Sequence, residues 1–257
     1  MRALTGHRSP LLRILLLFAA AGGCTWGSTN GVPFWGSKAD KEEAAANLKK
    51  YGPIARDRIS LVKEEGKYAA KGSPDDKEKV SADLARMIQT EQDPLVREEI
   101  VRTLATIPTE TAANVLAAGM KDSEPKVRVA VCQAWGKRGS PVKFITEPTS
   151  HQEVVNAATL ALAQALASDT NIDVRLAAAR ALGKVQNNPR AIGALGIALK
   201  DRDPALQVRA IASLKESSNK DFGNDVTKWQ QYVDSVAPPS PQESPKAVAD
   251  RPSDRPQ

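Results

Sequence analysis

The chain contains few of the residues from which catalytic centres and metal sites are usually built. Only two cysteines and two histidines occur among its 257 residues. His151 has no acid or cysteine at the spacing of a metal ligand, and Cys132 has no nearby histidine to activate it. Phosphate-binding loops, dinucleotide fingerprints and the G-x-S-x-G motif are also absent from the sequence. We therefore expect no enzyme activity, no metal, no cofactor and no small-molecule substrate.

Aromatic residues are equally scarce, at 4% of the chain, although 41% of it is hydrophobic. Alanine, leucine and valine must therefore fill the core, which favours closely packed helices over a sheet. Basic residues exceed acidic ones by 36 to 30, but three of the arginines lie before residue 24, where there is no acid. The rest of the chain keeps 33 basic against 30 acidic residues, a net charge of +3. This balance does not predict a nucleic-acid partner.

Residues 1–23 have the organisation of a secretory signal peptide. Arginines precede a short apolar run from Ile14 to Ala21, and small residues follow. The run is too short to cross a bilayer, which needs about 20 apolar residues. The sequence AGGC, which ends at Cys24, resembles the lipobox of bacterial lipoproteins. That resemblance implies cleavage before Cys24 and a diacylglyceryl group on its thiol, whereas the alternative is ordinary secretion with an incidental cysteine.

A lipidated Cys24 would hold the protein on a bacterial membrane, because two or three acyl chains bind essentially permanently. Residues 24–38 are rich in Gly, Ser, Thr and Asn and are expected to form a flexible tether. Thr25 is not the aspartate that retains some lipoproteins in an inner membrane, so the resemblance favours an outer membrane in a cell that has two. We expect an exported protein that faces the periplasm or the extracellular space.

Four segments of the chain repeat one apolar pattern. They are EQDPLVREEIVRTLA from Glu91, DSEPKVRVAVCQAWG from Asp122, DTNIDVRLAAARALG from Asp169 and DRDPALQVRAIASLK from Asp201. In each segment apolar residues recur at steps of four, which places them on one face of a helix. We interpret the opening acid, with the proline that usually follows it, as the start of this helix. A second helical stripe precedes each segment, so each unit is a helix, a tight turn and another helix.

This pattern resembles the HEAT-like repeats, in particular the short bacterial form also found in phycobilisome lyases. The resemblance covers residues 78–217 and implies an all-α fold, a right-handed α-solenoid whose stacked helix pairs bury a continuous core. The solenoid is expected over residues 39–236, with capping helices at 39–70 and a closing helix at 221–234. Residues 237–257 are rich in proline and are expected to form a disordered tail.

In this family the marked polar positions are an acid in the turn and an arginine six residues later. The occupants here are Glu91 and Arg97, Asp122 and Arg128, and Asp169 and Arg175, while Gln207 replaces the arginine in the fourth unit. The arginines form either a basic stripe for an anionic partner or a structural ladder. In the ladder, each arginine bonds the acids of its own turn and of the neighbouring turn. The spacing follows the fold and favours the ladder.

The repeats are interrupted by extra residues between Gly136 and Gln152. Insertions in solenoids map to loops on one face, often the binding face. The candidates for contacting a partner there are Lys137, Arg138, Lys143, Phe144 and Ile145. A merely tolerated loop explains the same residues equally well.

These features predict a membrane-tethered scaffold that binds a protein partner through the surface of its repeats. Glu98, Lys126 and Arg180 are expected on the exposed face of the second helices, where they would contact that partner. Two alternatives stay open. One is a lyase-like enzyme or enzyme subunit of the phycobilisome-lyase type, against which export argues. The other is a structural protein of the cell envelope.

Overall fold

The computed structural model describes residue 46, residues 53–138 and residues 148–237. This part of the chain forms ten helices and contains no strand. The predicted signal peptide, Cys24, the tether and the tail beyond residue 237 lie outside the described residues. In chain order the helices are α3 (Ala55–Lys71), α4 (Pro74–Thr90), α5 (Pro94–Leu104), α6 (Glu110–Gly119), α7 (Pro125–Arg138), α8 (Pro148–Ser168), α9 (Ile172–Gly183), α10 (Pro189–Ala198), α11 (Pro204–Ser218) and α12 (Val226–Val236).

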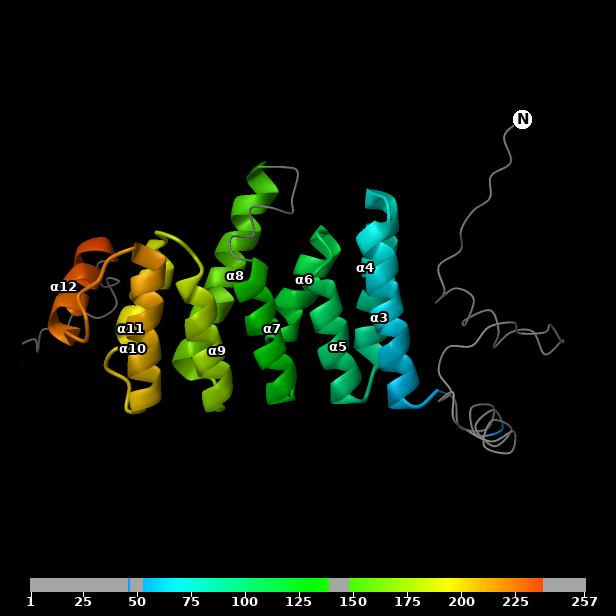
Figure 1. Cartoon of the computed structure of the whole chain (residues 1–257), viewed down its shortest axis with the longest axis horizontal. Coiled ribbons are helices and arrows are strands. Elements are labelled where there is room, and N and C mark those ends of the chain that lie inside the picture. The colour runs from blue at the N-terminus through cyan, green and yellow to red at the C-terminus, as the bar shows by residue number, and fades with distance from the viewer. Residues whose placement is uncertain (1–45, 47–52, 139–147, 238–257) are drawn as a thin grey trace, which may run out of the picture.

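The helices form two layers that run along one axis (Figure 1). One layer contains α3, α5, α7, α9 and α11, each packed against the next, and its solvent side is called the B face here. The other layer contains α4, α6, α8, α10 and α12, and its solvent side is called the A face. Helix α3 extends the first layer at one end, and α12 extends the second layer at the other. The stack is an α-solenoid, which confirms the fold class predicted from the sequence.

The core lies between the layers and is built from the predicted apolar positions. Each second helix buries three of them at steps of four, and all twelve are at most 5% exposed. A helix pair alone would leave this stripe in water, so each unit depends on its neighbours for burial. The twelve residues are Val96, Ile100, Leu104, Val127, Val131, Trp135, Val174, Ala178, Leu182, Leu206, Ala210 and Leu214.

The opening acids do not start the helices, which corrects the interpretation from the sequence. Glu91 precedes α5 by three residues, and the residue that caps α5 is Asp93, whose side chain accepts a hydrogen bond from the Leu95 amide. Asn171 and Asp203 cap α9 and α11 in the same way. Such side chains satisfy amides that a helix start leaves unbonded. The acids therefore lie in the turn between the two helices of a unit, where they are available for other contacts.

The closing helix also begins later than predicted. Asp225 caps α12 through the Lys228 amide, so the helix starts at Val226 rather than at residue 221. The residues before it turn at Gly223, whose φ of 59° suits glycine. Trp229 is completely buried, and its indole nitrogen donates to the Gly223 carbonyl at 3.0 Å. Trp229 and Val233 are both buried, and α12 packs on α10.

Candidate functional site

The acids and arginines of the repeats form a row that links one unit to the next. Arg97 donates to Asp122 from Nε at 2.8 Å and from Nη2 at 2.9 Å. Arg128 donates to Asp169 in the same fork, at 2.7 and 2.9 Å. Each arginine therefore bonds the carboxylate of the following turn rather than that of its own turn. Paired hydrogen bonds of this kind fix the geometry of both partners.

Within its own turn each of these two arginines bonds backbone carbonyl groups. Arg97 Nη1 donates to the Gln92 carbonyl at 2.9 Å, and Arg128 Nη1 donates to the Asp122 carbonyl at 2.8 Å. Gln207 keeps this contact in the fourth unit, where its Nε2 donates to the Asp201 carbonyl at 2.6 Å. The side chain of Gln207 therefore replaces the arginine within the turn.

The acids complete the turns in which they lie. Glu91, Asp122, Asp169 and Asp201 each accept a hydrogen bond from the amide two residues later, at 2.8–2.9 Å. Hydrogen bonds from Arg128 hold the pKa of Asp169 below its usual range, against the opposing effect of burial. The acid is thus shared between its own turn and the preceding unit.

The row extends beyond the six residues expected from the sequence. Arg58 on α3 binds Glu91 at 2.8 and 3.1 Å, and Arg175 binds Asp201. Arg58 lies five residues after Pro53, whose carbonyl it bonds, as Arg97 lies five after Gln92. Helix α3 lacks the rest of the repeat pattern. The five-residue interval between Pro53 and Arg58 was therefore the only feature of the sequence that could have identified Arg58 as a member of the row. All four guanidinium groups are occupied by the chain itself, as a ladder requires.

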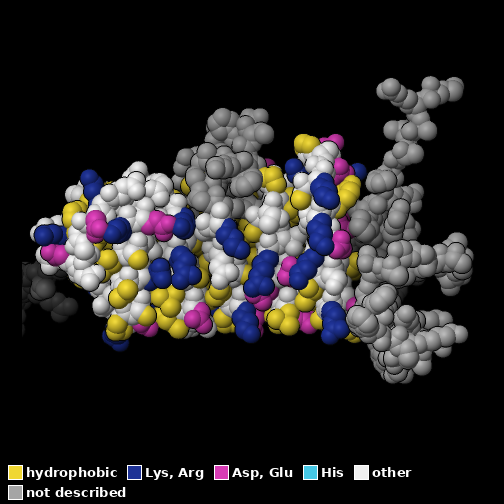
Figure 2. Space-filling model, in the orientation of Figure 1, with side chains coloured by type: hydrophobic (Ala, Val, Ile, Leu, Met, Phe, Trp, Pro, Cys, Tyr) yellow, Lys and Arg dark blue, Asp and Glu magenta, His cyan; other side chains and the backbone are white. Residues whose placement is uncertain are grey.

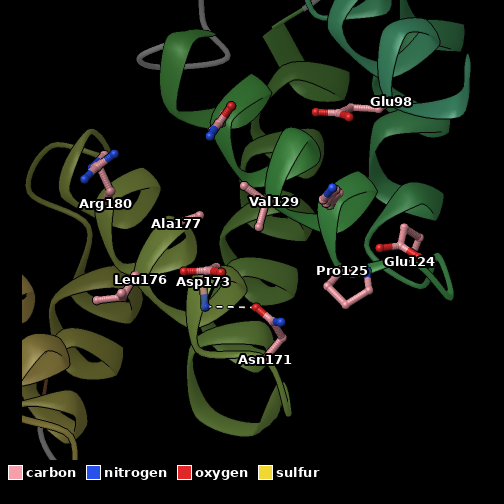
Figure 3. Close-up of a pocket in the computed structure, with 11 residues that line it drawn as sticks. Glu98, Glu124, Pro125, Val129, Asn171, Asp173, Leu176, Ala177 and Arg180 are labelled. Atoms are coloured by element: carbon pink, nitrogen blue, oxygen red, sulfur yellow. Dashed lines mark hydrogen bonds between the residues drawn. The ribbon is translucent and has the colours of Figure 1, made fainter. Parts of the chain in front are cut away.

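A hollow of about 490 Å³ opens on the B face between α5, α7 and α9 (Figure 3). Glu98, Lys126 and Arg180, expected on this face, all contribute to its lining. Val129, which lies near the centre of the view, and Leu176 line it as well. The sequence analysis did not single out these apolar residues, although they occupy equivalent positions two residues after the buried Val127 and Val174. Charged side chains thus surround an aliphatic floor.

A smaller hollow of about 130 Å³ lies between the carboxyl-terminal halves of α5 and α7. Arg102 and Lys137 line it, and Gln133 lines both hollows, so the two are adjacent. Lys137 is exposed, and it is the member of the candidate insertion that the structure places on the B face. Arg138 lies in the last turn of α7, but its side chain is not described, and Lys143, Phe144 and Ile145 lie outside the described residues.

The charged groups around the hollows are mostly unpaired. Arg102 binds Glu98 at 2.5 Å within α5. Lys126, Lys137 and Arg180 form no ion pair with another described residue. Figure 2 shows Lys and Arg side chains spread along the visible face of the molecule, with Asp and Glu side chains between them. The unpaired side chains of Lys126, Lys137 and Arg180 can form ion pairs with a partner at little desolvation cost.

The described residues do not assemble a metal-binding centre. Among them no three His, Cys, Asp or Glu side chains gather as a metal site would require. Cys132 is fully buried against Met120, with 3.9 Å between the sulfur atoms. Burial raises the pKa of its thiol to about 12, so the nucleophilic thiolate is scarce. Cys132 therefore packs as a small apolar residue.

A comparison with protein families agrees with the repeat architecture. A family model for HEAT repeats matches residues 81–163 and 159–228, which together make up more than half of the chain. A crystal structure of an engineered protein is similar at 16% identity and a TM-score of 0.43, over 77% of this chain and 98% of that one. No curated protein matches. The chain therefore belongs to the HEAT-repeat family.

Proposed function

We propose that this protein is a non-enzymatic scaffold that binds a protein partner through the B face of α5, α7 and α9. The observation that carries the proposal is the aliphatic floor of Val129 and Leu176 within a rim of charges that are mostly unpaired. Protein interfaces combine an apolar centre with a polar rim in this way. HEAT repeats suggest such a role for the family.

We further propose that the protein is exported and that lipid on Cys24 holds the scaffold on a bacterial membrane. In a cell with two membranes, this is the outer membrane. The lipobox-like AGGC sequence supports this part of the proposal. In the described part of the chain, each helix is too short or too polar to cross a bilayer. The intact mass of the mature protein from native membranes tests the tether. A chain that begins at Cys24 and carries acyl groups is expected, whereas one without lipid contradicts it.

Crosslinking in native membranes, followed by capture of the protein, tests the binding face. Arg180→Glu and Lys137→Glu should each reduce the yield of the crosslinked partner, because each reverses a positive charge on the rim of the hollows. Arg190→Glu is the matched control, since Arg190 is also an exposed arginine but lies at the start of α10, outside the hollows. Circular dichroism verifies that the variants remain folded. Equal capture by all of them would exclude the B face as the binding surface.

A further inference from the structure

The B face carries opposite charges at its two edges. Glu124 and Asp173 lie at the amino-terminal ends of α7 and α9. Arg102, Lys137 and Arg180 lie toward the carboxyl-terminal ends of α5, α7 and α9. This placement suits the partial charges of the helix ends, which favour acids at the start and bases at the finish. All five side chains line the two hollows and can therefore face a bound partner.

The row of arginines aligns these ends along the solenoid. Arg97 links the turn before α5 to the turn before α7, and Arg128 links the turn before α7 to the turn before α9. The amino-terminal ends of the three helices consequently lie together. The acidic groups fall along one edge of the face and the basic groups along the other.

Two further charged residues reduce this asymmetry without removing it. Lys126 lies beside the acidic edge, which leaves two acids and one base there, a net charge of −1. Glu98 pairs with Arg102, which leaves three bases and one acid at the basic edge, a net charge of +2. The edges therefore still differ in sign.

The width of the face between the edges matches a helix. Asp173 and Arg180 are seven residues apart on α9, which corresponds to about 10 Å along the helix axis. A helix with its side chains is about 10–12 Å in diameter. Ala177 lies between Asp173 and Arg180 on α9, and Val129 on α7 lines the same hollow, where both can receive apolar side chains (Figure 3).

The walls of the hollows favour a helical occupant over an extended one. They are formed by helices, whose backbone amide and carbonyl groups are already bonded within each helix. An extended segment would bring unbonded backbone groups onto the aliphatic floor, at a cost in free energy. A helix brings none, because it satisfies its own backbone.

We propose that the B face binds an amphipathic helix of the partner that crosses α5, α7 and α9. Its apolar side chains pack on Val129, Leu176 and Ala177. One flank of the helix is acidic and faces the edge with Lys137 and Arg180, while the other flank is basic and faces the opposite edge. This inference rests on the proposed function and defines the chemistry of the segment recognised.

Two synthetic helical peptides of about 21 residues and identical composition test the proposal. Both carry leucine along one face. One has glutamates on one flank and lysines on the other, and the second has the same charges interleaved on both flanks. Fluorescence anisotropy with the full chain should show about ten-fold tighter binding of the segregated peptide. Equal affinities, or no binding of the segregated peptide, would contradict the proposal.

Charge reversal of the acidic edge provides a sharper version of the test. The double variant Glu124→Lys and Asp173→Lys makes both edges basic, so a peptide with glutamate on both flanks should become the preferred ligand by about ten-fold. The control reverses two exposed acids of other helices, Glu110→Lys on α6 and Asp234→Lys on α12, and should keep the original preference. If the double variant Glu124→Lys and Asp173→Lys also keeps the preference for the segregated peptide, the charges at the edges do not select the ligand.

The outcomes separate this inference from the proposed function. Loss of crosslinking by Arg180→Glu together with equal binding of the two peptides would retain the binding face and reject the segregated helix. Crosslinking that is insensitive to Arg180→Glu would reject the binding face itself.

Discussion

Arg128 joins two successive units with a single side chain. It binds the carboxylate of Asp169 in the next unit and the Asp122 carbonyl of its own turn. The side chains of Arg128 and Asp169 are only 13% and 9% exposed. Removal of one partner from such a pair leaves a poorly solvated charge, which is more damaging than the loss of an exposed pair. The row of arginines therefore fixes the register of neighbouring units.

Arg128→Ala should lower the free energy of unfolding by about 3 kcal/mol, because Asp169 then lacks its guanidinium partner. Urea unfolding followed by circular dichroism measures this loss. Lys184→Ala is the control, since the Lys184–Glu216 pair is 44% and 40% exposed and its removal should lower the free energy of unfolding by less than about 1 kcal/mol. Equal losses in the two variants would show that the row adds no more than surface pairing.

The pH dependence of stability should report the same pair. The pKa of Asp169 is lower in the folded chain than in the unfolded chain, where the pKa of aspartate is about 3.9. Its contribution to stability is therefore present above that value and is lost as the pH falls through the folded pKa. The difference in unfolding free energy between the wild type and Arg128→Ala should shrink as the pH is lowered from about 5. A difference that stays constant would exclude this linkage.

The sequence predicted that each arginine bonds the acids of its own turn and of the neighbouring turn, but Arg97 and Arg128 bond only the carboxylate of the neighbouring turn. The six-residue spacing identified Asp122 and Arg128 as members of one unit. Their partners come from adjacent units, and the contact depends on how closely the units stack. Sequence spacing within one unit contains no information about that distance. The sequence analysis missed Arg58 for a further reason. Helix α3 contributes this arginine to the row but does not share the apolar pattern by which the repeats were recognised.

At the scale of the helices, two equivalent glycines differ in the space around them. Gly136 ends the apolar stripe of α7, and Gly183 ends that of α9. A Cβ atom on Gly183 would lie 2.9 Å from the Cα atom of Ser213 on α11. The corresponding atom on Gly136 would lie 3.4 Å from the Cα atom of Ala181, an ordinary contact. The packing of α9 on α11 therefore requires glycine, whereas the packing of α7 on α9 does not.

Gly183→Ala should destabilise the protein by about 1–3 kcal/mol, because α9 and α11 must separate to admit the methyl group. Gly136→Ala should be neutral or stabilising by up to about 1 kcal/mol, since alanine favours the helical conformation. Thermal unfolding of the two variants compares them directly. Equal destabilisation by both substitutions would contradict the difference in packing.

Helix boundaries illustrate a second limit of the sequence. The apolar positions correctly indicated the helices of the repeats, because periodicity records which face is buried. The exact starts depended on capping hydrogen bonds, and several side chains near each start are able to make them. Asp221 and Asp225 are equally suitable by composition, but Asp225 caps α12 and the preceding turn lies outside the helix.

At the scale of the whole molecule, the solenoid separates packing from binding. Its apolar stripes face the space between the layers, while the B face retains unpaired charges around an aliphatic floor. The sequence predicted that Glu98, Lys126 and Arg180 lie on an exposed face. It did not predict that they surround one hollow, because the hollow exists only where three helices from distant parts of the chain are stacked. The binding role of the insertion at Lys143, Phe144 and Ile145 stays a prediction.

Site-specific photo-crosslinking in native membranes tests the proposed binding face most directly. Gln133 on α7 and Gln164 on α8 are both exposed glutamines, but Gln133 lines both hollows and Gln164 belongs to the opposite layer. A photoreactive residue at position 133 should crosslink a discrete partner, and the same residue at position 164 should not. Crosslinks from position 164 with none from position 133 would contradict the account, because the partner would then occupy the A face.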